Sequence, residues 1–385
     1  MSEAPPPPTP PRGTLSELAL VFLRLGFTAF GGPAAHIALL ETEVVRRRGW
    51  LSSQRFLDLL GAANLIPGPS SSELAISIGY ERAGALGLLV AGACFILPAA
   101  LITGALAWGY VRFGALPKVA GIFYGVKPVV IAIVLQALVA LAPKALKTRG
   151  LIGLGLATLA ASALGVGALP LLLGAGIATL AVRGVARGAG KTPVLSLAVL
   201  GKVGLTGAAA PVSLFGILCL FLKMGAVVFG SGYVLLAFLR ADLVERLHWL
   251  TEAQLLDAVA VGQITPGPVF CSATFVGYLL AGAPGAAVAT FAVFLPAFVL
   301  IAASRPLLAR VHEFAPLRDV LDGVNVASLS LMAVVTVQLG RAALIDLTTL
   351  AIACLSSLLL LKWRLNSLLL VLGGALTGLF VHGLR

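Results

Sequence analysis

The chain has 385 residues, of which 59% are hydrophobic and only 11% are charged, and its mean hydropathy is +1.05. Soluble domains carry about a quarter charged residues, so this composition excludes an ordinary soluble protein. The net charge of +12 would suggest nucleic-acid binding in a soluble chain. Here the basic residues lie largely in short gaps between apolar runs, where they set membrane orientation. We therefore expect a polytopic all-α membrane protein with no nucleic-acid partner.

The cysteines and histidines give no sign of a cofactor. The four cysteines (Cys94, Cys219, Cys271 and Cys354) are scattered through apolar sequence without a CxxC pair, and the four histidines are equally dispersed. This spacing fits neither a disulfide framework nor a zinc, haem or iron–sulfur site. We expect no metal and no cofactor.

The first 13 residues are rich in proline and lack the apolar core of a cleavable signal peptide. They are therefore predicted to form a disordered tail, 1–13. The rest of the chain consists of two halves with similar sequences, an internal repeat. A shift of 199 residues, and then of 198, aligns tryptophan, glycine and proline motifs of the two halves: Trp50 with Trp249, Pro67-Gly68-Pro69 with Pro266-Gly267-Pro268, and Leu97-Pro98 with Leu295-Pro296. We predict homologous halves at 14–190 and 205–385, joined by a linker at 191–204.

Each half is predicted to begin with a long helix, at about 15–40 and 212–239, that a glycine motif interrupts. A charged stretch follows, and then a helix with Ser52 or Thr251 as its N-cap runs into Pro-Gly-Pro. A second helix leaves that break. Four apolar helices complete the first half, at about 84–110, 122–142, 150–164 and 168–182, and the second half has counterparts of all four.

The Lys and Arg residues predict the orientation. If Arg46, Arg47 and Arg48 face the cytoplasm, and each Pro-Gly-Pro hairpin returns to the side it entered from, most of the basic residues lie inside. This arrangement needs about five spans per half in addition to the hairpin, an odd number, so the second half is inverted. Inverted repeats with paired broken helices are a known transporter architecture.

The helix breaks predict an anion site. Broken helices survive in hydrocarbon only inside protein or beside a cavity, and a helix N-terminus attracts anions. Two such ends, related by a pseudo-twofold axis, would converge and suit a tetrahedral oxyanion. The expected binding residues are the break positions and the polar side chains beside them: Gly31, Gly32, Pro33, Asn64, Pro67, Gly68, Pro69, Ser70, Ser71 and Ser72 in the first half, and Gly230, Ser231, Gln263, Thr265, Pro266, Gly267, Pro268, Cys271 and Ser272 in the second.

A structural role for these motifs is the alternative, because proline and glycine are frequent in membrane helices. Two Pro-Gly-Pro motifs in register, each preceded by an amide (Asn64 or Gln263), favour function. The Gly31-Gly32-Pro33 and Gly230-Ser231-Gly232 motifs serve close helix packing equally well.

Ionisable residues within the helices are further candidates. Arg24 and Lys223 occupy equivalent places and would line an anion pathway, or else extend to a nearby interface. Asp58 and Asp257 are also equivalent, and could pair with those cations, carry protons or face solvent. Glu73 is the third proton-coupling candidate, but its spacing from Ser70 is that of a capping box, which is the slightly favoured interpretation.

The chain resembles the chromate ion transporter family in its long two-domain form. The resemblance rests on FGGPAAHIALLETEVVRRRGWL (30–51), LIPGPSSSELAISIGYERAG (65–84) and CFILPAA (94–100), and on VVFGSGYV (227–234), WLTEAQLLDAVAVGQITPGPV (249–269) and FVGYLLAG (275–282). It implies a multi-pass protein of a bacterial inner membrane that exports chromate in exchange for protons and gives chromate resistance.

Several alternatives remain open at this point. Chromate has the shape and charge of sulfate, so the residues do not distinguish a chromate transporter from a transporter of sulfate or another oxyanion. An anion channel would use the same helix ends. An intramembrane aspartyl protease is disfavoured because neither Asp58 nor Asp257 lies in a Gly-x-Gly-Asp context, so we expect no enzyme. A homodimer is left open.

Overall fold

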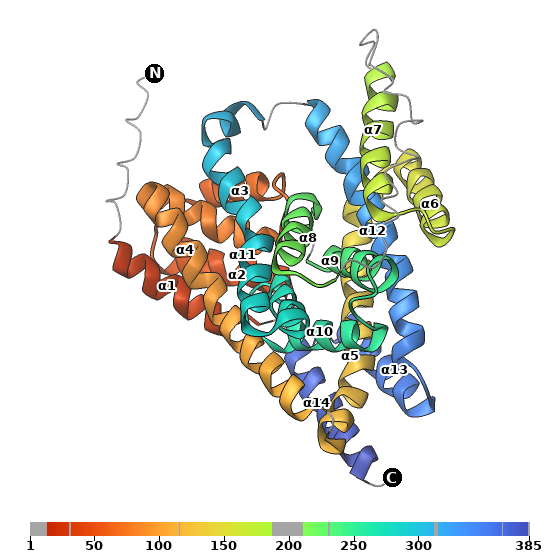
Figure 1. The fold of residues 1–385 in the computed structure, drawn as a ribbon. Helices are drawn as coiled ribbons and strands as arrows, with labels where there is room; N and C mark the ends of the chain where they lie inside the picture. The colour runs from red at the N-terminus through yellow and green to blue at the C-terminus, as the bar shows by residue number, and fades with distance from the viewer. Residues whose placement is uncertain are drawn as a thin grey trace, which may run out of the picture.

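A computed structural model describes residues 14–30, 32–114, 116–186, 211–229, 232–311, 315–363 and 365–383 (Figure 1). The predicted tail and linker, and the predicted site residues Gly31, Gly230 and Ser231, lie outside this described part of the chain. Within it, all regular secondary structure is helical. The expectation of an all-α protein is confirmed.

The helices of the two halves follow the same order. The first half contains α1 (Leu15–Thr28), α2 (Gly32–Glu41), the π-helical turn η1 (Thr42–Arg47), α3 (Ser53–Ala63), α4 (Ser70–Phe113), α5 (Pro117–Ala145), α6 (Arg149–Ala163) and α7 (Ala168–Ala186). The second half contains α8 (Leu214–Val227), α9 (Val234–Leu239), η3 (Arg240–Arg246), α10 (Glu252–Ile264), the short turn η4 (Val269–Cys271), α11 (Ser272–Val311), α12 (Ala315–Ala343), α13 (Leu347–Lys362) and α14 (Ser367–Gly383).

The predicted interruptions and caps are confirmed. The first long helix of each half is broken, between α1 and α2 and between α8 and α9. Ser52 accepts the backbone N–H of Arg55 at 3.2 Å, and Thr251 accepts that of Gln254, also at 3.2 Å. These side chains satisfy N–H groups that have no partner inside the helix.

Both long helices after the breaks fold back on themselves. Non-helical dihedrals occur at Ala83 and Gly84 in α4, where Gly84 has a φ of 62°, and at Ala281 and Gly282 in α11, where Gly282 has a φ of 64°. Residues eight apart in a straight helix are separated by about 12 Å. Gly79 and Gly87, however, approach so closely that neither has room for a Cβ. The predicted boundary near residue 84 is therefore a tight helical hairpin.

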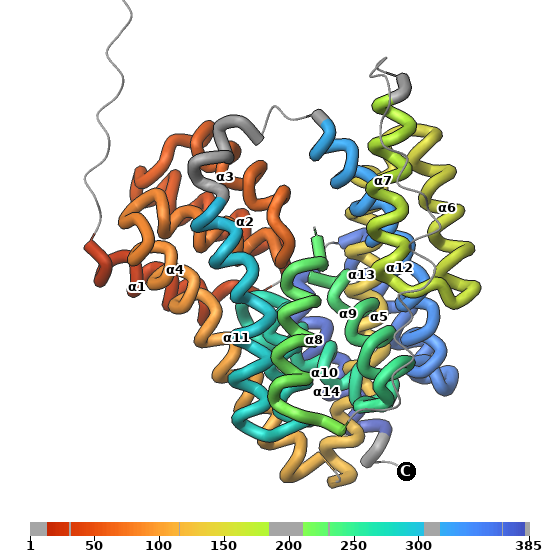
Figure 2. Tube along the Cα trace, turned by 45° about the horizontal axis from the view of Figure 1, so that its top comes forward, coloured from red at the N-terminus to blue at the C-terminus, as the bar shows by residue number. Residues whose placement is uncertain are grey.

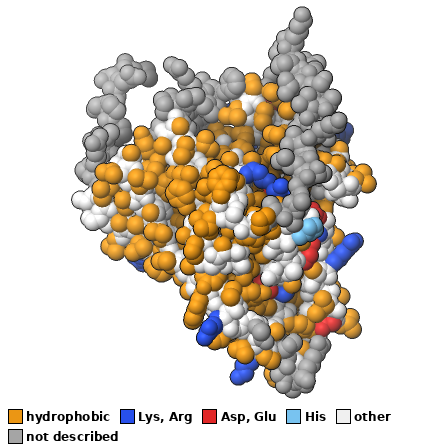
Figure 3. Space-filling model, viewed as in Figure 1, with side chains coloured by type: hydrophobic (Ala, Val, Ile, Leu, Met, Phe, Trp, Pro, Cys, Tyr) orange, Lys and Arg blue, Asp and Glu red, His pale blue; other side chains and the backbone are white. Residues whose placement is uncertain are grey.

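The helices are those of a multi-pass membrane protein. Among the described residues, four helices are long and apolar enough to cross a membrane, Ser70–Phe113, Pro117–Ala145, Val269–Ala303 and Pro316–Ala343, and five shorter apolar helices accompany them. Apolar side chains cover most of the face in Figure 3, and charged side chains on it are sparse. Large apolar side chains such as Leu101, 70% exposed, are suited to contact with lipid.

The second half is inverted relative to the first. Near the start of α5, the Tyr124 hydroxyl donates to Asp346, just beyond the end of α12, at 2.6 Å. Just beyond the end of α5, Lys147 pairs with Asp322, near the start of α12, at 3.0 Å. The two helices therefore run antiparallel. Because they are counterparts in the sequence repeat, their opposite directions are those of an inverted repeat.

The last helices of each half pack on the other half. Helices α6 and α7 pack against α12, and α13 and α14 pack against α5 (Figures 1 and 2). Glycines permit the closest approach, since Gly125 of α5 lies against the backbone of Gly374 in α14 without room for a Cβ. The two repeats thus interlock around α5 and α12, which run beside the helix breaks.

Candidate functional site

The two Pro-Gly-Pro breaks are each hydrogen bonded to the interrupted helix of the opposite half. The Gly68 N–H donates to the Val228 carbonyl at 2.7 Å, and the Gly267 N–H donates to the Ala29 carbonyl at 2.8 Å. These four positions are related pairwise by the repeat shift. Both breaks are buried. The reciprocal bonds satisfy backbone groups that the breaks would otherwise leave unpaired inside the protein.

A cavity of 550 Å³ lies beside the first break. Four predicted residues line it, Gly32, Pro33, Asn64 and Ser70. Its lining also includes polar side chains that were not predicted as site residues: Gln136 and Lys144 of α5, Tyr233 just before α9, and Asn325 and Ser328 of α12. A search for polar residues that interrupt apolar helices would have found Gln136 and Asn325. The cavity combines hydrogen-bond donors from both halves.

The cavity extends towards the end of α5. Lys144 and Ala145, at the C-terminal end of that helix, line it together with Gln136, which lies about two turns earlier. The Lys144 side chain is exposed. Lys147 and Arg149 follow in sequence, and the Arg183 guanidinium lies 2.7 Å from Asp322, the same carboxylate that Lys147 contacts. The end of the cavity at Lys144 is thus rich in basic side chains.

The helix after the first break does not begin as the capping-box interpretation requires, with Ser70 as its N-cap. The N-cap of α4 is Pro69, and Ser70 is its first helical residue. Ser71 lies 3.3 Å from His36 Nδ1. The capping-box interpretation of Glu73 is wrong: within the described part of the chain, neither of its carboxylate oxygens has a hydrogen-bond partner. Glu73 is fully buried, and its carboxyl group occupies the space where a Cβ of Gly68 would lie.

The second break is packed more tightly. Thr265 donates to the Gly262 carbonyl at 3.3 Å, and Ser272 donates to the Val269 carbonyl at 2.8 Å. Cys271 is fully buried. Gln263 accepts from the Tyr233 hydroxyl at 3.4 Å, which connects the second break to the cavity, while the Gln263 Nε2 is buried without a partner among the described residues.

The predicted cations lie away from the cavity lining. Arg24 is exposed on α1, and Lys223 forms an ion pair with Asp242. The suggested pairing of these cations with Asp58 and Asp257 is therefore wrong. Asp58 is exposed and accepts from Gln54 at 3.1 Å.

Asp257 is buried and has a different cationic partner. Its Oδ1 lies 2.9 Å from Lys127 Nζ, and its Oδ2 accepts from the Tyr110 hydroxyl, also at 2.9 Å. Lys127 belongs to α5 and Tyr110 to α4, so this cluster joins helices of the first half to α10 of the second. Nothing in the local sequence around Asp257 indicates these partners.

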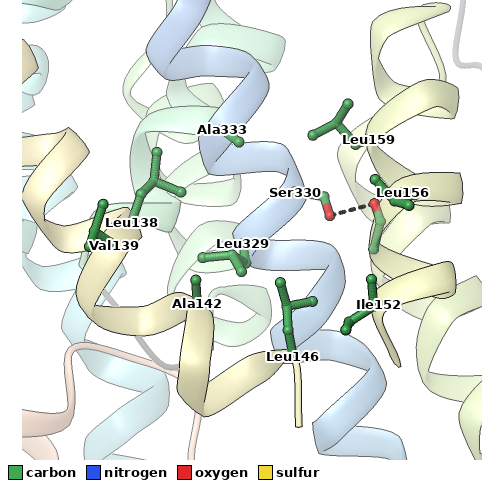
Figure 4. A pocket seen from close by; sticks show the side chains of 11 residues that line it. Leu138, Val139, Ala142, Leu146, Ile152, Leu156, Leu159, Leu329, Ser330 and Ala333 are labelled. Carbon is green, nitrogen blue, oxygen red and sulfur yellow. Dashed lines mark hydrogen bonds between the residues drawn. The ribbon is translucent and has the colours of Figure 1, made fainter. Parts of the chain in front are cut away.

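A second cleft, of 320 Å³, lies between α5, α6 and α12 (Figure 4). Aliphatic side chains line it, and Ser330 is the one polar side chain among them. Its hydroxyl donates to the Gly155 carbonyl at 2.9 Å. The cleft therefore offers an anion no spare donor. Among the described residues, no group of three or more His, Cys, Asp or Glu side chains could hold a metal ion.

Comparison with known proteins assigns both halves. The sequence profile of the family described as "Chromate transporter" matches residues 16–182 and 215–379. The chain is 33% identical over 382 residues to the "Chromate transport protein" of Cupriavidus metallidurans, and the alignment covers 98% of this chain and 95% of the relative. It is 32% identical over 399 residues to the "Chromate transport protein" of Pseudomonas aeruginosa, in an alignment that covers 99% of this chain and 94% of the relative. No solved structure matches the chain.

Proposed function

We propose that this chain, which belongs to the chromate transporter family, exports chromate across a bacterial inner membrane in exchange for protons and thereby confers chromate resistance. The observation that carries the proposal is the polar cavity beside the first helix break. It lies between the two inverted halves, where transporters of this architecture bind their substrates.

The chemistry of the cavity suits a tetrahedral oxyanion. Chromate presents four acceptor oxygens and two negative charges. Asn64 offers an amide donor from one side, and Asn325 offers one from the other. Gln136 also lines this second side, and one of its amide N–H groups donates to the Leu360 carbonyl at 3.4 Å. The N-terminus of α4, which begins at Ser70, adds a partial positive charge of about one half. At about 30 Å³ per water molecule, the 550 Å³ cavity has room for the anion together with water.

The basic end of the cavity supports export. Lys144, Lys147, Arg149 and Arg183 gather at this end, and clusters of Lys and Arg mark the cytoplasmic side of membrane proteins. With this end on the cytoplasmic side, the cavity faces the cytoplasm, and chromate enters it from there. The same charges would raise the local concentration of the anion.

Glu73 is the best-placed group for proton coupling. An unpaired carboxylate is costly to bury, so this fully buried side chain is suited to take up and release a proton as its surroundings change. It lies against the first break, three residues after the cavity residue Ser70. The corresponding part of the second half carries Cys271 and Ser272, which are not acids.

Transport into inside-out membrane vesicles tests this proposal. We expect chromate uptake that depends on an acidic lumen and disappears when a protonophore collapses the pH gradient. Sulfate, molybdate and phosphate should compete weakly. Stronger uptake of sulfate would assign the cavity to that anion instead, and uptake that ignores the pH gradient would exclude proton exchange. Single-channel currents far above carrier rates would identify a channel.

A further inference from the structure

The two Pro-Gly-Pro hairpins have the same sequence pattern but opposite environments. Helix α3 of the first hairpin is buried along one face only, whereas its counterpart α10 is buried along most of its length. Leu57 is 57% exposed and its repeat counterpart Leu256 is 1% exposed. Asp58 is exposed, and its counterpart Asp257 is only 5% exposed. The inverted repeat is thus open around one hairpin and closed around the other.

Specific helices close the second hairpin. Helix α10 packs against α5, α12 and α14, while α3 packs mainly against α4. The ionic contact in this closure is that between Lys127 of α5 and Asp257 of α10, at 2.9 Å, with Tyr110 of α4 holding the other carboxylate oxygen. The closure therefore contains a buried ion pair between the two halves.

The repeat relates this closure to the open cavity. Lys127 is the counterpart of Asn325, and Gln263 is the counterpart of Asn64. Asn325 and Asn64 both line the open cavity. If the two halves exchanged conformations, as inverted repeats do in alternating access, Lys127 and Gln263 would line a cavity that opens to the opposite side.

We propose that the Lys127–Asp257 ion pair is the closed gate of this second, oppositely facing cavity, and that Lys127 binds the transported oxyanion once the gate opens. The identity of the anion rests on the proposed function, but the gate does not. The expected ligand is a tetrahedral dianion. The Lys127 ammonium group, once released from Asp257, would take the place in the second cavity that the neutral Asn325 amide has in the first. The anion would replace Asp257 as the partner of Lys127.

Thiol accessibility tests the gate. In a background with Cys94, Cys219 and Cys354 replaced by serine, Leu60→Cys places a thiol in the open cavity and Val259→Cys places one at the buried counterpart position, which is 0% exposed. With a membrane-impermeant thiol reagent, we expect labelling of the Leu60→Cys thiol alone. Adding Asp257→Asn should increase labelling of the Val259→Cys thiol, from the opposite face of the membrane, by at least tenfold. Unchanged labelling overturns the gate.

Two further variants separate the gate from general destabilisation. Tyr124→Phe breaks a different hydrogen bond at the same end of α5 and should leave both labelling rates unchanged. Exchanging the charges, with Lys127→Asp and Asp257→Lys together, should restore protection of the Val259→Cys thiol. If Asp257→Asn and the charge exchange label equally fast, the ion pair is not the gate.

The binding role of Lys127 has its own readout. In the Asp257→Asn variant, chromate at about 1 mM should slow labelling of the Val259→Cys thiol at least fivefold, a factor that corresponds to about 1 kcal/mol. Adding Lys127→Gln should abolish the protection, and persistence of protection would overturn the binding role. Protection by sulfate but not chromate would keep the gate and reject chromate as the proposed substrate.

Discussion

Gly68 donates its backbone N–H to the carbonyl of Val228 in the opposite half, at 2.7 Å, and the repeat-related Gly267 does the same to Ala29, at 2.8 Å. Each helix break is therefore held by the other repeat. A movement of one repeat that shifts its interrupted helix also shifts the break in its partner. These bonds provide a physical route by which the two hairpins could move together.

Gly68→Ala should reduce chromate transport at least tenfold. Gly68 has a φ of +134°, which a side chain strains, and the Glu73 carboxyl group fills the space that a Cβ needs. Transport into vesicles is the measurement. Gly49→Ala is the matched control, because Gly49 also has a positive φ, of +58°, but open space around it. It should cost about 1 kcal/mol of stability and preserve transport. Equal losses in both variants would contradict the account.

Glu73→Gln should uncouple transport from protons. The amide keeps the shape of the side chain but cannot exchange a proton, so chromate–chromate counterflow should persist while uptake driven by a pH gradient falls at least tenfold. Comparing the two assays in the same proteoliposomes gives the result. Thr103→Ala is the control, since Thr103 is another buried residue of α4 whose hydroxyl has no partner among the described residues. Normal gradient-driven uptake in Glu73→Gln would exclude the proposed role.

Asn325→Ala should raise the KM for chromate about tenfold. A hydrogen bond to a charged ligand contributes about 1.5 kcal/mol, which corresponds to that factor. Initial uptake rates over a range of chromate concentrations provide the measurement. Ser330→Ala on the same helix α12 lies in the apolar cleft and should leave KM unchanged. A higher KM in Ser330→Ala but not in Asn325→Ala would contradict binding in the polar cavity and would place the anion in the apolar cleft instead.

Acidification should weaken the charged turn η1 through Glu43. Burial opposes ionisation of this carboxyl group, but the hydrogen bonds and charges of Arg48 and Arg47 outweigh it and lower its pKa below the usual 4.5. A lowered folded-state pKa gives stability that is complete above the unfolded-state pKa and is lost as the pH falls through the folded-state value.

The expected loss therefore lies below about pH 4.5. Thermal unfolding of the detergent-solubilised protein at a series of pH values measures it. Glu43→Gln should lower the unfolding temperature at neutral pH and flatten its pH dependence. Glu41→Gln should have little effect, because the Glu41 carboxylate, which pairs with Arg46, is more exposed than that of Glu43. The same acid dependence in Glu43→Gln as in the wild type would refute the contribution of this carboxylate.

Local sequence was sufficient for the repeat, the helix breaks and the caps at Ser52 and Thr251, because glycine, proline and capping side chains act over a few residues. It was insufficient for Glu73. Glu73 lies three residues after Ser70, as in a capping box, but Ser70 is the first helical residue of α4 and not its N-cap. The Glu73 carboxyl group lies against Gly68 instead.

Contacts between residues far apart in the chain could not be predicted from the local sequence. Gln136 and Asn325 reach the cavity, and Lys127 reaches Asp257, only through the packing of α5 and α12 between the halves. The different exposures of Asp58 and Asp257 also have no local cause, since the two residues share one sequence pattern. They reflect an asymmetric arrangement of two similar halves, which a repeat in the sequence does not specify.

Proton movement in proteoliposomes tests the central claim most directly. With purified protein and a pH-sensitive dye in the lumen, an imposed chromate gradient should drive saturable proton flow in the opposite direction to chromate. An equal sulfate gradient should drive much less, and Glu73→Gln should abolish the chromate-driven flow. Chromate that crosses the membrane without moving protons, or an equal response to sulfate, would contradict chromate–proton exchange through this site.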